Sequence, residues 1–451
     1  MQVAKSTVVV GSTNIKSFSR FENLILTAML FSILLPNAPQ YIFMGLLFIL
    51  FMVKKKWRMA PLMEGDGRTI ALGLFVLFAS TWFVGLSHLY ISGDWAQWQV
   101  VLSDNWHLTG KICLRGIFIY WALKSAFASG WRLEHSLPAL SVFLFVYCGY
   151  CFLQMAIGIN WVHGFSEVLP PNRFNYGVYR VSGLTGHPVT LGYSSLLLAL
   201  MSLFLLFTPK DRSIKEKRLL LWVSIASCII VVLSQTRWAI LILVCAYSSL
   251  AAHLTYRNFR KKRSLLNGWK TIVPLGGGLS ILSFGALGRV SELFNSEIDL
   301  FERIPRLVFW KVHWQAFLDN PLLGIGFVNR KSEIMDYYSR AGYTSMERKY
   351  NAHNIYLQWL ADSGLIGALG FCFLMGCLVV ISFRLLKNGS INGVIFVTSV
   401  LCTGLLQNTF RDSEFIFSFW ICFSLLLLGT RYASSHLVNL KMTDIDGRKL
   451  T

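Results

Sequence analysis

Residues 364–383 read GLIGALGFCFLMGCLVVISF, a run of twenty residues without one charged side chain. A helix of about that length crosses the hydrocarbon core of a bilayer, so the run is typical of a transmembrane segment. The rest of the chain has the same character, since 54% of its 451 residues are hydrophobic, only 14% are charged and the mean hydropathy is +0.53. Soluble domains carry about 25% charged residues. This composition therefore excludes an ordinary soluble enzyme and a disordered nucleic-acid-binding tail.

Similar apolar runs recur along the sequence and predict an all-α integral membrane protein with about twelve transmembrane helices. No separate soluble domain is evident, so residues 1–451 are expected to form a single polytopic membrane domain. The first two runs are short and share a proline-containing turn, so they could instead form one re-entrant pair. The expected spans are 22–36, 40–53, 69–87, 112–128, 136–157, 188–208, 219–234, 238–256, 271–288, 364–383, 391–407 and 415–430.

The formal net charge of +20 belongs almost entirely to one set of the connecting loops. That set contains both ends of the chain and has 27 Lys and Arg residues against 8 acidic residues, a balance of +19. The opposite set has 14 of each kind, and Arg115 inside a span is the remaining basic residue. Because Lys and Arg are enriched in cytoplasmic loops, both termini are expected inside the cell. The large loop 289–363, between spans 9 and 10, is then expected outside.

The basic cytoplasmic loops need no nucleic-acid partner, because contact with membrane lipid headgroups explains them. All nine cysteines fall inside expected spans, so a disulfide framework in the exported loops is not expected. Acidic residues with metal-ligand spacing are sparse on the outer side, where Glu297 and Asp299 form one such pair. We therefore predict no metal ion and no cofactor. Function is expected on the outer side, where irregular segments mix His, Arg and aromatic residues.

The first outer candidate is Arg237, in the sequence SQTRWAIL at 234–241 between two spans. A tight turn there fixes its Cα at the membrane surface, where a guanidinium can bind a lipid phosphate through two parallel hydrogen bonds. An arginine that merely snorkels to the interface explains the position equally well.

A second outer segment, YRVSGLTGHP at 179–188, directly precedes a span. Pro188 suits the start of a helix, and the two glycines permit a close approach of the backbone to a ligand. Arg180 and His187 would then lie at the mouth of the helix bundle. A loop that ends in a helix cap accounts for the same residues.

A third outer segment, ERIPRLVFWKVHWQAFL at 302–318, predicts an amphipathic helix lying on the outer leaflet. Arg303 and Arg306 lie in its first turn, where the backbone amides favour anions. The apolar residues at helical spacing are Leu307, Trp310, Trp314, Phe317 and Leu318.

The fourth outer segment is NAHNIYLQWLADSGLIGALG at 351–370. Asn351 can cap a helix, which would put His353 in its first turn at the membrane surface. The helix dipole disfavours an imidazolium there, so a neutral histidine able to act as a base is expected. Gly364 starts a series of three glycines spaced by three, which would let another helix pack closely. Taken alone, His353 is better explained as a surface histidine.

Together the four segments suit a lipid-linked diphosphate, whose phosphates the arginines would hold while the histidine removes a proton from an attacking hydroxyl. The competing interpretation is a transporter, which predicts internal repeats and ionisable residues near the middle of the membrane. No repeat is evident, and the ionisable residues of interest gather on one side. This one-sided distribution favours an enzyme.

Two short motifs of the sequence resemble the O-antigen ligase and polymerase superfamily of bacterial inner membranes. His353, followed by ten residues and Gly364, matches H-x10-G, and Arg237, followed by three residues and Leu241, matches R-x3-L. The resemblance extends over about residues 170–410 and includes the order of the motifs and the single large outer loop.

The resemblance implies a GT-C-type fold and a metal-independent, inverting glycosyltransferase acting at the periplasmic face. Its donor would be a glycan linked to undecaprenyl diphosphate. If the matching motif positions have the same roles as in the family, His353 would be the general base and Arg237 would bind the diphosphate. Arg306 would share that role, with Arg303 as the fallback.

The acceptor separates the possible activities. A ligase uses a sugar hydroxyl of lipid A–core, and a polymerase of O-antigen or exopolysaccharide uses a second lipid-linked glycan. Both need the same base and the same arginines, and we prefer the ligase because both of its motifs are complete. A lipid-linked glycan flippase is a third interpretation. Arg180 and His187 are further candidates for substrate binding.

Overall fold

The computed structural model describes residues 20–53, 62–93, 95–158, 174–175, 178–208, 212–260, 305–326, 330–343, 351–387 and 390–447. Within these ranges the regular secondary structure is helical, apart from one hairpin of two-residue antiparallel strands. These strands are β1 (Phe174–Asn175) and β2 (Val178–Tyr179). The predicted all-helical class is confirmed.

Six helices of the described chain are long and apolar enough to cross a membrane. They are α3 (Asp66–Ser92), α6 (Leu137–Ile157), α7 (Pro188–Phe207), α9 (Arg237–Arg260), α14 (Ile355–Lys387) and α16 (Ser413–Gly447). The chain is therefore a multi-pass membrane protein by length and composition of its helices.

Five further helices fall on predicted spans. They are α1 (Arg20–Phe31), α2 (Asn37–Val53), α5 (Lys111–Ala128), α8 (Ile214–Leu233) and α15 (Asn392–Thr403). Helices α5 and α8 have the length of a span but carry several charged residues, whereas α1, α2 and α15 are shorter. The predicted span 271–288 lies outside the described residues. A total of twelve spans stays a prediction.

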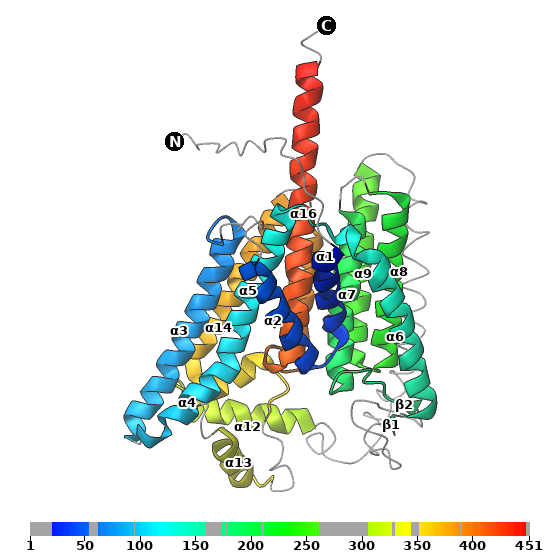
Figure 1. Cartoon of the computed structure of the whole chain (residues 1–451). Coiled ribbons are helices and arrows are strands. Elements are labelled where there is room, and N and C mark those ends of the chain that lie inside the picture. Colours follow the sequence, from blue (N-terminus) through cyan, green and yellow to red (C-terminus); the bar gives the residue numbers. More distant parts are fainter. Residues whose placement is uncertain are drawn as a thin grey trace.

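The helices stand side by side, with α7 and α16 near the middle of the bundle (Figure 1). Helix α7 and the part of α16 from Ser413 to Arg431 are buried along most of their length, which fits their nearly continuous apolar sequences. Helices α3, α5 and α14 lie on one side of them, and α6, α8 and α9 on the other (Figure 1). Close packing follows from small residues, for example where Gly116 of α5 lies against the indole of Trp420.

Short helical segments join or extend these elements. One continuous extension of α5 consists of α4 (Trp98–Asn105) and the π-helix η3 (Trp106–Gly110), preceded by η2 (Trp95–Gln97). The remaining short elements are η1 (Ser32–Leu34), η4 (Leu133–His135) and η7 (Thr409–Arg411).

Two helices cross the lower end of the bundle in Figure 1: α12 (Pro305–Asp319), with α13 (Arg330–Arg340) beneath it. They share a small apolar core with the beginning of α14, separate from the main core of the bundle. That core contains Val308, Phe309, Val312, Ile334 and Tyr338. The large loop predicted at 289–363 therefore contains two helices packed on the bundle, while residues 289–304 lie outside the described chain.

Candidate functional site

His353 lies immediately before α14 at this lower end. The helix is capped by Asn354, whose Oδ1 accepts hydrogen bonds from the backbone amides of Tyr356 (3.0 Å) and Leu357 (3.1 Å). The expectation that Asn351 caps the helix and puts His353 in its first turn is therefore wrong. Asn354 accepts the hydrogen bonds of the first-turn amides instead. His353 has a backbone φ of 50°, in the left-handed region that non-glycine residues rarely adopt.

The imidazole of His353 is half-buried between two structural elements. Its Nδ1 lies 3.1 Å from Oε1 of Gln407, and its ring lies 5.7 Å from the ring of Phe309 in α12. Because a carbonyl oxygen only accepts hydrogen bonds, this contact fits the tautomer in which Nδ1 carries the proton. In a neutral imidazole the lone pair is then on Nε2, the nitrogen able to accept a proton.

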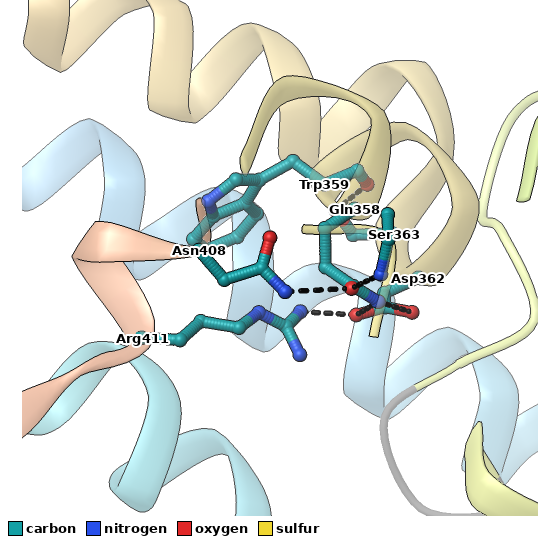
Figure 2. Close-up of polar contacts among 7 residues, drawn as sticks. Gln358, Trp359, Asp362, Ser363, Asn408 and Arg411 are labelled. Atoms are coloured by element: carbon teal, nitrogen blue, oxygen red, sulfur yellow. Dashed lines mark hydrogen bonds and ion pairs between the residues drawn. The ribbon is translucent and has the colours of Figure 1, made fainter. Parts of the chain in front are cut away.

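A buried polar network holds the segment before His353 in place (Figure 2). Oε1 of Gln358 accepts hydrogen bonds from the backbone amide of Ala352 (2.7 Å) and from Nδ2 of Asn408 (3.0 Å). The Nε2 of Gln358 lies 3.0 Å from both carboxylate oxygens of Asp362, which in turn forms an ion pair with Arg411. Figure 2 shows the guanidinium directed at that carboxylate. The network joins the first turns of α14 to residues 408–411.

Gly364, the glycine of the H-x10-G motif, interrupts α14 with φ 59° and ψ −161°. A Cβ there would overlap the carbonyl of Leu322 and lie 2.6 Å from the nitrogen of Leu323, so only glycine fits. The segment 321–326 fills the break and satisfies the backbone groups that the helix releases. Four hydrogen bonds do so: Ile325 N to Ala361 O, Gly326 N to Asp362 O, Leu365 N to Pro321 O and Ile366 N to Leu322 O.

The expected helix-packing role of the glycine series applies to only one of its members. Gly370 faces Ser80 of α3, and a side chain at that position would collide with it. Gly364 contacts a loop and not a helix, so that interpretation of Gly364 is corrected. Gly367 lies against Ser363 of its own helix.

Arg237 is the first residue of α9 and is exposed. The preceding turn, in which Gln235 has φ 51°, packs on the beginning of α7, where Oγ1 of Thr236 donates to the carbonyl of Pro188 at 3.2 Å. The next residue, Trp238, donates its Nε1 hydrogen bond to the carbonyl of Cys402 at 2.7 Å. The turn therefore holds the Arg237 backbone from both sides. Leu241, one turn further along α9, is exposed.

The segment before α7 approaches the same turn. Its Val181 amide donates to the carbonyl of Leu233 at 3.4 Å, which brings the adjacent Arg180 beside the end of α8. His187 is the N-cap of α7, and its Nδ1 accepts a hydrogen bond of 3.1 Å from the amide of Val189. His187 thus has a capping role, and Pro188 occupies the first helical turn as predicted.

Arg306 lies in the first turn of α12 and is exposed, close enough to the hydroxyl of Tyr193 in α7 for an electrostatic interaction. Arg303 lies outside the described residues. The face of α12 that packs on the protein carries Val308, Phe309 and Val312, not the predicted apolar series. Of that series, Trp314 (48%) and Leu318 (51%) are exposed. The other three, Leu307, Trp310 and Phe317, are half-buried, and Nε1 of Trp310 donates a hydrogen bond of 3.1 Å to the carbonyl of Ala352.

The structure therefore gathers five of the six predicted site residues at one end of the bundle. Both His353 and Arg237 lie near the end of α15. The backbone amide of Ile355, two residues after His353, donates to the carbonyl of Gly404 at 2.8 Å. The carbonyl of Cys402, in the same turn, accepts the hydrogen bond of Trp238, the residue after Arg237. Arg180 and His187 adjoin the turn that carries Arg237. Arg306 lies on the helix that covers His353.

Charged residues missed in the sequence lie beside these. Asp412 caps α16 through the amides of Glu414 and Phe415 and accepts a hydrogen bond from Thr190. Burial raises the pKa of the Asp412 carboxyl, against the opposing effect of these hydrogen bonds and of Arg115. Among the described residues no three His, Cys, Asp or Glu side chains meet to hold a metal ion, and Glu297 and Asp299 lie outside them.

Gln358, Asp362, Gln407, Asn408 and Arg411 were also missed. The spacing of Gln358 and Asp362 by four residues places both on one helix face and is the one signal that pointed to a pair. Nothing in the sequence around 407–411 indicated that its side chains meet those of α14.

The fold and this cluster define a multi-pass helical membrane protein with a basic, histidine-containing site at one end of its bundle. Residues 219–372, about a third of the chain, match the family model described as O-antigen ligase. The resemblance to the O-antigen ligase superfamily is thereby confirmed over a segment that includes Arg237, Arg306, His353 and Gly364. No curated protein matches the chain.

Proposed function

We propose that the protein is an O-antigen ligase of the bacterial inner membrane, a GT-C-type, inverting glycosyltransferase. It transfers a glycan from undecaprenyl diphosphate to a sugar hydroxyl of lipid A–core at the periplasmic face, with both termini in the cytoplasm. The observation that carries this proposal is the Nδ1 contact of His353 with Gln407, which leaves Nε2 as the basic nitrogen at the same end as Arg237 and Arg306.

In the proposed step, Nε2 of His353 removes the proton of the acceptor hydroxyl. The oxygen attacks the anomeric carbon of the donor sugar and forms the new glycosidic bond. The bond from that carbon to the diphosphate oxygen breaks at the same time, and its electron pair leaves with undecaprenyl diphosphate. A single displacement of this kind inverts the anomeric configuration.

The negative charge that develops on the leaving diphosphate needs stabilisation, which guanidinium groups supply well because they bind phosphate through two hydrogen bonds. The exposure of Arg237 and Arg306 leaves both able to reach a lipid-linked substrate. Arg303, Arg180 and His187 are further candidates for this contact. Such a guanidinium clamp stabilises the leaving group without a metal ion, and we propose that the reaction is metal-independent.

The alternative is a polymerase of O-antigen or exopolysaccharide, whose acceptor is a second lipid-linked glycan. It would use the same base and the same arginines. A lipid-linked glycan flippase is a less favoured candidate, because the polar side chains described above gather at one end of the bundle and not along a path through it.

Purified protein supplied with labelled lipid-linked donor, with and without lipid A–core, separates these activities. Label on the core supports the ligase. Longer donor-linked glycan without core indicates the polymerase. Movement of donor across a vesicle bilayer without any transfer indicates a flippase and would overturn the proposal.

A further inference from the structure

We infer that Gln407 is a positioning residue that holds the proton of His353 on Nδ1 and directs Nε2 toward the reacting hydroxyl. The inference rests on the proposed transfer reaction. It assigns a role to a residue that lies 54 positions beyond the histidine and outside the segment 219–372 matched by the family model.

The contact itself sets the tautomer. Gln407 presents its Oε1 to Nδ1 of His353 at 3.1 Å, a normal hydrogen-bond distance. An oxygen acceptor at this place stabilises the Nδ1–H tautomer, whereas a residue without an acceptor would leave the choice of tautomer to other contacts. A general base on Nε2 requires the Nδ1–H tautomer.

The two partners are also held together by a route that does not involve the contact. One atom, Oε1 of Gln358, accepts hydrogen bonds from the residue before His353 and from the residue after Gln407, namely Ala352 and Asn408. Gln358 is fully buried and is oriented by Asp362. The hydrogen bonds of Gln358 to the backbone amide of Ala352 and to the side chain of Asn408 therefore hold the two segments that carry the histidine and the glutamine beside each other.

The imidazole is restrained on a second side by Phe309, at 5.7 Å between ring centroids. The left-handed backbone conformation of His353 is unfavourable by itself, so the surrounding contacts must stabilise it. Together these contacts hold the ring in one orientation before any substrate binds. Such preorganisation is what a general base needs, because a misdirected nitrogen loses the contribution of proton transfer.

Gln407→Met tests the inference, since methionine has a similar length and no acceptor oxygen. We expect kcat to fall by at least about tenfold, within the 10²- to 10⁴-fold total contribution of a general base, and KM for donor and acceptor to stay within about twofold. Gln407→Glu keeps an acceptor oxygen and should retain more activity than the methionine variant. Gln315→Met is the matched control, because Gln315 is exposed on α12 and donates to nearby Asp319 within its own helix.

Nitrogen NMR of protein labelled with ¹⁵N-histidine supplies a readout that does not depend on activity. The His353 signals, assigned by their loss in His353→Ala, should report a protonated Nδ1 in the wild type and in Gln407→Glu, and a changed tautomer population in Gln407→Met. Wild-type kcat in Gln407→Met, or an unchanged tautomer in that variant, would overturn the inference. Retained transfer by His353→Ala would instead overturn the proposed function, and the NMR result would still decide the contact.

Discussion

The indole of Trp238 donates a hydrogen bond of 2.7 Å to the carbonyl oxygen of Cys402. This bond fastens the beginning of α9, where Arg237 lies, to the last turn of α15. The hydroxyl of Tyr356 binds the carbonyl of Leu401, the preceding residue, at 2.7 Å. The end of α15 therefore anchors both the helix that carries Arg237 and the helix that follows His353, and it brings the proposed phosphate ligand and the proposed base to one place.

Replacement of Arg237 should weaken donor binding. Charge-assisted hydrogen bonds contribute about 1.5–3 kcal/mol, so Arg237→Ala is expected to raise the Kd for a lipid-linked diphosphate by about 10- to 100-fold. Arg237→Lys should recover little of this loss, because the planar guanidinium binds two oxygens at once. Binding of labelled donor to the detergent-solubilised protein measures both. Arg257→Ala, at the other end of α9, is the control and should bind normally. A lysine variant with wild-type affinity would argue against the clamp.

The ion pair of Asp362 and Arg411 should contribute strongly to stability. Asp362 is completely buried, and removal of one partner leaves an uncompensated charge that costs about 3–5 kcal/mol. Asp362→Asn and Arg411→Gln should each lower the unfolding temperature clearly, and the double variant should lose less than the sum of the two. Arg384→Gln removes one partner of Asp66, a carboxylate that is also buried but keeps its second partner Arg431, so this variant should lose less stability than either change at the Asp362–Arg411 pair. Additive losses in the double variant would mean that the pair is not coupled.

Gly364→Ala should disrupt the break in α14. The left-handed backbone and the overlap with Leu322 together are expected to cost at least about 2 kcal/mol and to displace the segment 321–326. Gly376→Ala is a matched control in the same helix, where a Cβ meets nothing within 4 Å and should be neutral or slightly stabilising. Thermal unfolding of both variants in the same detergent makes the comparison. Equal stability of the two would contradict the described break.

Transfer activity should persist in excess EDTA, because the proposed charge stabilisation comes from arginines. The assay is the transfer of labelled glycan by purified protein before and after chelation. Loss of activity that a divalent cation restores would point to Glu297 and Asp299 as ligands.

The membrane class and most helix positions follow from apolar runs alone, as the match between predicted span 188–208 and α7 illustrates. Hydropathy failed at α14, which begins at Ile355 and not near 364. The first turns contain Gln358 and Asp362, whose burial depends on Asn408 and Arg411 about fifty residues away. Local sequence does not contain that information.

The residues of the candidate site could be proposed one by one from the sequence, but their arrangement could not. His353 and Arg237 were identified from short motifs, whereas their common anchor at the end of α15 depends on how three helices pack. Gly364 was interpreted as a packing glycine because the loop that fills its break, residues 321–326, lies about forty positions upstream. Gln407 belongs to no motif, and its contact with the imidazole of His353 became evident only in the structure.

The central claim is that His353 is the general base of a glycan transfer, and the rate of transfer by purified His353→Ala tests it most directly. With labelled lipid-linked donor and lipid A–core, transfer should fall by about 10²- to 10⁴-fold, while the variant still inserts into membranes and binds donor. His107→Ala, an exposed histidine of η3, should transfer at the wild-type rate. Transfer by His353→Ala near the wild-type rate would contradict the account.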